Sequence, residues 1–314
     1  MKKKAIILSL KGYRLSKKEK LLISKEKPWG LILFKRNIKS LSQIKKLITE
    51  IKKLSKDKKF PILIDEEGSA VTRLSAIFNH NFNANYFGKL YESDKKIAVN
   101  LYRQYIKTLC ISLSDIGINI NTIPVLDVLR RNTNKIIGKR SFSNKKEIVK
   151  IFGEITIKEC CSHKIINVIK HVPGHGCSSV DSHVNLPKVN LDKNELSNID
   201  FYPFKFTTAK MAMTAHILYT KIDPKNVTTF SSKIINQIIR KEIGFKGIII
   251  SDDISMKALK YNLVTNAKKS LAAGCNLVLY CAGNIKDNFK LIKSVPFIDN
   301  FTKKKTSEIL KILR

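Results

Sequence analysis

The densest group of chemically active residues is the run Lys170-His-Val-Pro-Gly-His-Gly176. Together with His183, it places three of the six histidines within thirteen residues. Gly174 and Gly176 tolerate positive φ, and Pro173 restricts the chain just before them, so this run is predicted to fold tightly over the rim of a sheet. Imidazole titrates near neutral pH, so the loop has the residues for general acid/base chemistry.

Asp181 and His183 follow this run and lie two residues apart. In an extended chain their side chains point to the same side, close enough for the carboxylate to accept a hydrogen bond from the imidazole. That pairing orients the ring and raises its basicity, which suits a general acid/base. The alternative is an aspartate that caps a turn beside a surface histidine, and the spacing alone leaves both readings open.

A second candidate group is Asp252-Asp253, which ends the apolar run at 247–250. An aspartate held at the end of a buried strand can serve as a nucleophile or as a metal ligand. The alternative for Asp253 is a helix N-cap.

A metal site would have to use His171, His175, His183 and Asp252. The sequence contains no H-x-H or H-E-x-x-H pair, and Lys170 would place a cation beside the ion. We therefore expect neither a metal nor any other cofactor.

These residues need a scaffold that brings distant segments together, and the apolar pattern predicts one. Eight short apolar runs are each followed by a helical pattern, which predicts a single-domain (β/α)8 TIM barrel over residues 1–314. A doubly wound open sheet is the alternative, but no G-x-G-x-x-G follows the first strand. The expected strands are 5–10, 31–34, 61–64, 118–125, 165–169, 211–215, 247–250 and 277–280.

Chemistry in such a barrel lies where the strands end. Five of the expected strands end in titratable groups, at Asp65, Asp127, His171, His216 and Asp252. One such residue is readily explained as a solvated loop charge, but five at one rim are not explained by packing.

The composition limits the remaining classes of function. Hydrophobic residues make up 43% of 314, which excludes global disorder, and no apolar run approaches the roughly 18 residues that span a bilayer. The first ten residues imitate a signal peptide, but Lys11 and Arg14 interrupt it. Six cysteines without a C-x-x-C pair fit a reducing compartment. We therefore expect a cytoplasmic protein, and we expect it to be a monomer with no membrane attachment.

The net charge of +34 comes from 59 basic and 25 acidic residues. The basic excess is spread along the chain rather than gathered in one arm, so we interpret it as a solvated, lysine-rich surface and expect no nucleic-acid partner. A basic polyanion-binding protein stays open as an alternative from a different class.

Seven segments, in this order, resemble glycoside hydrolase family 3, in particular its single-domain bacterial β-N-acetylglucosaminidases of peptidoglycan recycling. The similarity extends from Ala5 to about Cys281. The segments are IDEEGSAVTR (64–73), PVLD (124–127), GKRSF (138–142), KHVPGHG (170–176), DSH (181–183), TAH (214–216) and GIIISDDISM (247–256).

The resemblance implies a (β/α)8 barrel without metal that releases terminal N-acetylglucosamine from muropeptides carrying 1,6-anhydro-N-acetylmuramic acid. It implies Asp252 as the catalytic nucleophile, His183 as the acid/base and Asp181 as its partner. It also implies a set of residues that hold the sugar, namely Asp65, Arg73, Arg140, Lys170 and His171. Another family 3 activity, such as that of a β-glucosidase, is the alternative among enzymes.

Two motifs depart from the family pattern. The usual D-Q-E-G-G-R reads Asp65-Glu-Glu-Gly-Ser-Ala70, and the acidic residue common before the arginine of G-[DE]-R-S is Lys139. The first change removes an arginine and a glycine beside Asp65, so glycan preference is where this chain is expected to differ from its relatives.

Overall fold

Eight parallel strands close into a barrel, in the order β1-β10-β9-β7-β5-β4-β3-β2. The computed structural model describes residues 2–182 and 185–313. The predicted (β/α)8 barrel is confirmed, and the open-sheet alternative is wrong, because β1 and β10 pair and leave no edge. That residues 1–314 form one catalytic domain stays a prediction. The barrel strands are β1 Lys4–Ser9, β2 Pro28–Leu33, β3 Ile62–Ile64, β4 Ile120–Asn121, β5 Ile166–Val172, β7 Met211–Thr214, β9 Ile248–Asp253 and β10 Leu277–Leu279.

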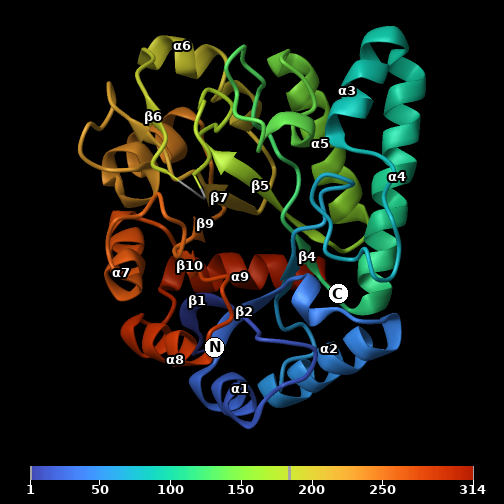
Figure 1. Cartoon of the computed structure of the whole chain (residues 1–314), viewed down its shortest axis with the longest axis vertical. Helices are drawn as coiled ribbons and strands as arrows, with labels where there is room; N and C mark the ends of the chain where they lie inside the picture. The colour runs from blue at the N-terminus through green and yellow to red at the C-terminus, as the bar shows by residue number, and fades with distance from the viewer. Residues whose placement is uncertain (1, 183–184, 314) are drawn as a thin grey trace.

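Helices surround the barrel on its outside (Figure 1). They are α1 Lys17–Leu21 with its π-helical continuation η1 Leu22–Glu26, α2 Leu41–Ser55, α3 Ala84–Ser93, α4 Lys95–Ile116, α5 Lys146–Ser162, α6 Lys193–Asn198, the π-helix η6 Ile234–Glu242, α7 Leu263–Ala273, α8 Ile285–Ser294 and α9 Asn300–Ile312. Helix α2 shows why these segments fold so. Ser40 caps its N-terminus by accepting from the N–H of Gln43, and Ile44, Leu47 and Ile51 form its buried face.

The structure differs from the predicted elements in three places. The expected strand 118–125 shortens to β4, because the chain leaves the sheet at Thr122 and Pro124 has no N–H to donate. Helix α3 precedes α4 and adds a second helix after the expected strand 61–64, and Gly88 in its middle weakens the helical signal. Two short strands outside the barrel, β6 Lys188–Val189 and β8 Leu218–Tyr219, pair with each other and were not predicted.

The hydrophobic interior has two parts. The larger one fills the space between the barrel and its helices. The smaller one fills the barrel itself, with side chains such as Ile7, Leu63 and Ile250, and it includes Ile309 of α9. Trp29 Nε1, near the start of β2, donates to Thr306 Oγ1 of α9 over 2.9 Å. Helix α9 therefore closes the end of the barrel where the strands begin, and Figure 1 shows it lying across the strands there.

Candidate active site

A cavity of about 260 Å³ lies at the carboxyl ends of the barrel strands. It is lined by Asp65, Glu67, Val71, Arg73, Ile136, Ile137, Arg140, Lys170, His171, His175, Ser182, Met213, Asp252, Leu279 and Cys281. Six of the eight residues predicted for the site are therefore brought together here. Asp181 does not line the cavity itself, but its neighbour Ser182 does. His183, the eighth, lies outside the described residues.

Lys170 lies between two carboxylates on the floor of this cavity. Its Nζ is 2.6 Å from Glu67 Oε1 and 3.4 Å from Asp65 Oδ1. It also donates to Thr122 Oγ1 over 2.8 Å, and that hydroxyl donates to Asp65 Oδ1 over 2.5 Å. Lys170 is at the end of β5 and the carboxylates follow β3, so the barrel itself sets their distance.

Arginines complete this network. Arg140 donates two hydrogen bonds to Glu67, from Nε to Oε2 over 2.7 Å and from a terminal nitrogen to Oε1 over 2.9 Å. Arg73 donates to Asp65 Oδ2 over 3.0 Å. Burial raises the pKa of Glu67, but Arg140 and Lys170 outweigh it and hold that pKa at about 2. Burial also raises the pKa of Asp65, but Lys170 and Arg73 outweigh it, and that pKa lies well below its usual range. Both carboxylates are therefore ionised at neutral pH.

Glu67 was not among the predicted site residues. It follows Asp65 by two positions, the spacing that puts two side chains of an extended segment on the same side, and this was the available signal.

The buried carboxylate of Asp127 orients the histidine loop. Its Oδ2 is 2.7 Å from His171 Nδ1, and its Oδ1 accepts from the backbone N–H of His171 and His175 over 3.2 and 2.6 Å. Burial raises the pKa of Asp127, but His171 outweighs it and the pKa is lowered. Since Asp127 takes Nδ1, the Nε2 edge of the His171 ring is left for the cavity. Asp127 ends a predicted strand, but its role as the partner of His171 was missed.

His175 joins this loop to the segment that carries the predicted dyad. Its Nε2 lies 3.3 Å from Ser182 Oγ, and its ring meets that of His171 edge to face at 5.6 Å. Burial and the neighbouring His171 lower the pKa of His175 to about 4, so the ring is neutral at pH 7. His175 therefore supports the loop as an uncharged group.

The two aspartates at the end of β9 point to different surroundings. Asp252 lines the cavity, and its Oδ1 accepts from the N–H of Asp253 over 2.7 Å. The Asp253 carboxylate instead accepts from the N–H of Ser255 and of Cys281, over 3.0 and 3.2 Å. Burial raises the pKa of Asp253. Of the pair, Asp252 is thus the one placed to meet a ligand.

His216, at the end of β7, is fully buried and supports this strand end from behind. Its Nε2 lies 3.0 Å from the carbonyl oxygen of Asp253, and its Nδ1 lies 2.7 Å from Thr229 Oγ1. Burial lowers the pKa of His216, so the neutral ring donates from Nε2 to that carbonyl. It holds the backbone next to Asp252 and is not part of the cavity wall.

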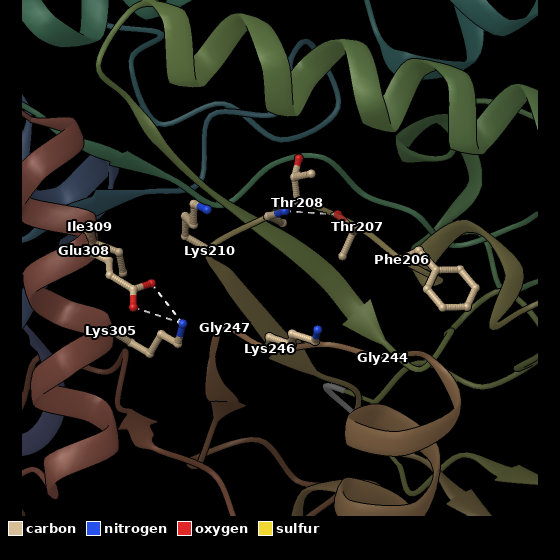
Figure 2. A pocket seen from close by; sticks show the side chains of 11 residues that line it. Phe206, Thr207, Thr208, Lys210, Gly244, Lys246, Gly247, Lys305, Glu308 and Ile309 are labelled. Carbon is tan, nitrogen blue, oxygen red and sulfur yellow. Dashed lines mark hydrogen bonds and ion pairs between the residues drawn. The ribbon is translucent and has the colours of Figure 1, made fainter.

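A second cavity, of about 400 Å³, lies at the opposite end of the barrel, beside α9 (Figure 2). Residues just before β7 and β9 line it, including Lys210 and Lys246, and Lys305 pairs there with Glu308 at 2.9 Å. None of the predicted site residues that the structure describes lies in it, so the chemistry belongs to the first cavity.

Within residues 2–182 and 185–313, no group of three or more histidine, cysteine, aspartate or glutamate side chains is arranged to hold a metal ion. Over the same residues, none of the helices combines the length and apolar character that crossing a bilayer requires.

A closed parallel barrel whose strand ends surround a sugar-sized cavity with carboxylates, arginines, a lysine and a histidine is a glycoside hydrolase architecture. The chain belongs to glycosyl hydrolase family 3, whose N-terminal domain model matches residues 2–307. The predicted family and enzyme class are thereby confirmed.

Two curated relatives are named beta-hexosaminidase. The one from Nitrosomonas eutropha is 32% identical over 281 residues, which is 88% of this chain and 80% of that protein. The one from Neisseria meningitidis is 32% identical over 297 residues, which is 91% of this chain and 81% of that protein. Among solved structures, NagZ from Neisseria gonorrhoeae in complex with N-trifluoroacetyl-D-glucosamine superposes with a TM-score of 0.88. It is 29% identical, and the match covers 98% of this chain and 90% of that one.

Proposed function

We propose that the protein is an exo-acting, retaining β-N-acetylhexosaminidase that releases terminal N-acetylglucosamine from peptidoglycan fragments carrying 1,6-anhydro-N-acetylmuramic acid. The observation that carries this is the cavity at the strand ends, whose wall holds Asp252 together with side chains fixed as hydrogen-bond donors. Relatives named beta-hexosaminidase, and a similar structure that binds an N-acylated glucosamine, support the choice of an amino sugar. A cavity of about 260 Å³ has room for one sugar residue, which fits cleavage from a chain end.

In this proposal Asp65, Arg73, Arg140, Lys170 and His171 hold the sugar. Asp65 is the acceptor for two hydroxyls, while Arg73 and Lys170, already ion-paired to it, donate to the same oxygens from either side. Arg140 is fixed by its two hydrogen bonds to Glu67, so its remaining N–H groups have a defined direction for the acetamido carbonyl.

Hydrolysis with retention proceeds in two steps. Asp252 attacks the anomeric carbon, the glycosidic bond breaks, and His183 transfers its proton to the departing oxygen. The neutral imidazole of His183 then takes a proton from water, which attacks the same carbon and releases Asp252. Asp181 stabilises the imidazolium form and orients the ring. Ser182, the residue before His183 in the chain, lines the cavity and so supports this assignment.

The direct test compares hydrolysis of p-nitrophenyl N-acetyl-β-glucosaminide with that of the matching β-glucoside, followed by a muropeptide with a 1,6-anhydro end. We expect turnover of the acetamido substrate and release of N-acetylglucosamine from the muropeptide. Preference for the glucoside would instead support the alternative family 3 activity, and failure on both would contradict the proposal.

Asp252→Asn is the matching test of the site. The swap preserves shape and removes the nucleophile, so we expect turnover to fall roughly 10³-fold or more with an unchanged fold. Asp253→Asn is the control, because its carboxylate faces Ser255 and Cys281 rather than the cavity. Near-normal activity in Asp252→Asn with a dead Asp253→Asn would move the assignment by one residue.

We further propose that the protein acts in the cytoplasm as a monomer on small glycans, without a nucleic-acid or membrane partner. Size-exclusion chromatography with light scattering tests the monomer, for which the expected mass is 35.7 kDa.

A further inference from the structure

The loop between β3 and α3 carries Arg73 into the cavity, and Glu66 fixes its backbone. Glu66 is fully buried, and its Oε2 accepts from the N–H of Arg73 and of Leu74, over 2.7 and 3.0 Å. The main chain of Glu66 is itself held by Asn121 on β4, which accepts from its N–H over 3.0 Å and donates to its carbonyl oxygen over 2.9 Å. Glu66 thus ties the Arg73 loop to the barrel wall.

The second oxygen of Glu66 contacts a histidine. Its Oε1 is 2.7 Å from His80 Nε2, and the His80 side chain is only 4% exposed. Glu66 Oε1 and His80 Nε2 therefore lie in direct contact in the interior. On the far side, His80 Nδ1 lies 2.9 Å from the Tyr105 hydroxyl of α4. Glu66, His80 and Tyr105 therefore form a continuous link from the end of β3 to α4.

Neither Glu66 nor His80 lines the cavity, but Arg73 does. Arg73 is held at both ends. Its guanidinium lies 3.0 Å from Asp65 Oδ2, and its backbone N–H donates to Glu66 over 2.7 Å. With both ends fixed, little conformational freedom is left to lose when a ligand binds.

We propose that Glu66 and His80 are positioning residues that hold Arg73 in its binding orientation, so that substrate affinity depends on a buried pair which the substrate never touches. This rests on the proposed function only for the identity of the ligand. The pair acts on ground-state binding, so its loss should raise KM and leave kcat largely unchanged.

The test is a double-mutant cycle between Glu66 and Arg73 in the full-length enzyme. We expect Glu66→Leu to raise KM about tenfold with kcat changed less than threefold, because it removes the acceptor of two backbone N–H groups. In an Arg73→Ala background, the same change should alter KM less than twofold, since the residue through which it acts is gone. Equal effects of Glu66→Leu in both backgrounds, or no effect on KM, would overturn the proposal.

Glu66→Gln and His80→Phe keep the proposal testable if Glu66→Leu does not fold. Glu66→Gln retains an oxygen for the two N–H groups, so KM should stay within about threefold of the wild type. His80→Phe removes the contact at Glu66 Oε1 and should raise KM, and Glu66→Gln should restore it in the double variant, because a neutral amide costs less to bury than a carboxylate without a partner. A double variant no better than His80→Phe would contradict the role of the His80 contact.

The control is Glu19→Leu. Glu19 is also a buried glutamate that accepts from two backbone N–H groups, those of Lys11 and Ser16, over 2.9 and 2.8 Å, but it does not line the cavity. It should lower the melting temperature and leave KM unchanged. Amide hydrogen exchange at Arg73 and Leu74 gives a readout that needs no substrate. Both amides should lose protection in Glu66→Leu, and retained protection would overturn the positioning role even if the proposed activity proved wrong.

Discussion

At the scale of single residues, the charges around the cavity balance only when Asp252 is counted. Two carboxylates, Asp65 and Glu67, face the three cations Arg73, Arg140 and Lys170. The surplus positive charge shares the cavity with Asp252, so the network and Asp252 together are close to neutral. An uncharged sugar can therefore enter without a large net field, while the donors around it stay fixed by ion pairs.

The proposed acid/base role of His183 predicts a dependence on the leaving group. His183→Ala should slow cleavage of a natural disaccharide more than that of a p-nitrophenyl glycoside, because p-nitrophenolate departs with little protonation. With the activated substrate the intermediate on Asp252 should accumulate, and azide should restore turnover by attacking without a general base. Steady-state rates with and without azide measure both effects.

Asp181→Ala should show a weaker form of this pattern, because the imidazole remains but is poorly oriented. Equal losses on both substrates without azide rescue would point to a structural role of His183 in the loop.

His175 predicts how stability depends on pH. Its pKa of about 4 in the folded protein lies below the usual 6.5, so between these values the unfolded chain binds a proton that the folded protein does not. Stability should therefore fall as pH drops from about 6.5 to about 4, by about 3 kcal/mol from this residue alone. Urea unfolding of the wild type and of His175→Gln at several pH values checks this, and the difference between them should shrink toward low pH. A constant difference would show that the buried ring titrates normally.

Sequence alone could identify residues that end strands, and these include Asp65, Lys170 and Asp252. It could not identify which side chains support them. Glu67 meets Arg140 across 73 positions, and Asp127 meets His171 across 44, so only the closed barrel reveals that these groups pair. Glu66 was visible in its motif, but its partner His80 lies in a segment with no recognisable pattern.

At the scale of elements, apolar periodicity predicted the eight barrel strands because each is a short buried run beside turn residues. It failed where local signals are weak. Helix α3 carries Gly88, whose position is set by packing, since a Cβ there would lie 1.8 Å from the Phe142 carbonyl oxygen. Strands β6 and β8 are two residues each and exist only through pairing with each other.

Helix α9 predicts a loss of stability that leaves substrate binding unchanged. Ile309→Ala removes a fully buried side chain from the interior of the barrel and should cost about 2–4 kcal/mol. Lys303→Ala, on the exposed side of the same helix, should cost less than about 0.5 kcal/mol. Denaturant unfolding measures both, and KM should be unchanged in both because α9 lies at the far end from the site. A cost for Ile309→Ala no larger than for Lys303→Ala would mean that α9 does not contribute to the interior.

At the scale of the whole molecule, the net charge of +34 is exposed to different extents at the two ends of the barrel. Lysines stand just before four barrel strands and away from the cavity, at Lys27, Lys164, Lys210 and Lys246. The carboxyl end of the barrel instead pairs its cations with buried acids. The two ends of the barrel therefore differ in how much of their positive charge faces solvent.

We expect a heparin column to retain the protein at low salt and to release it as salt rises, because surface charges are screened beyond about 10 Å at 0.1 M. KM for an uncharged substrate should stay constant over the same range. Retention that persists near 1 M salt would mean a specific polyanion site and would revive the polyanion-binding alternative.

The position of α9 also matters while the protein is being made. The strand that closes the barrel, β10, and the helix that seals its interior, α9, leave the ribosome after the seven other barrel strands. Until they emerge, β1 has no neighbour on one side and the apolar barrel interior stays open to solvent. A nascent chain stalled before about residue 277 thus exposes an unpaired strand edge, which is a target for chaperones and for aggregation. For this barrel, commitment to the native state must wait until β10 and α9 have emerged.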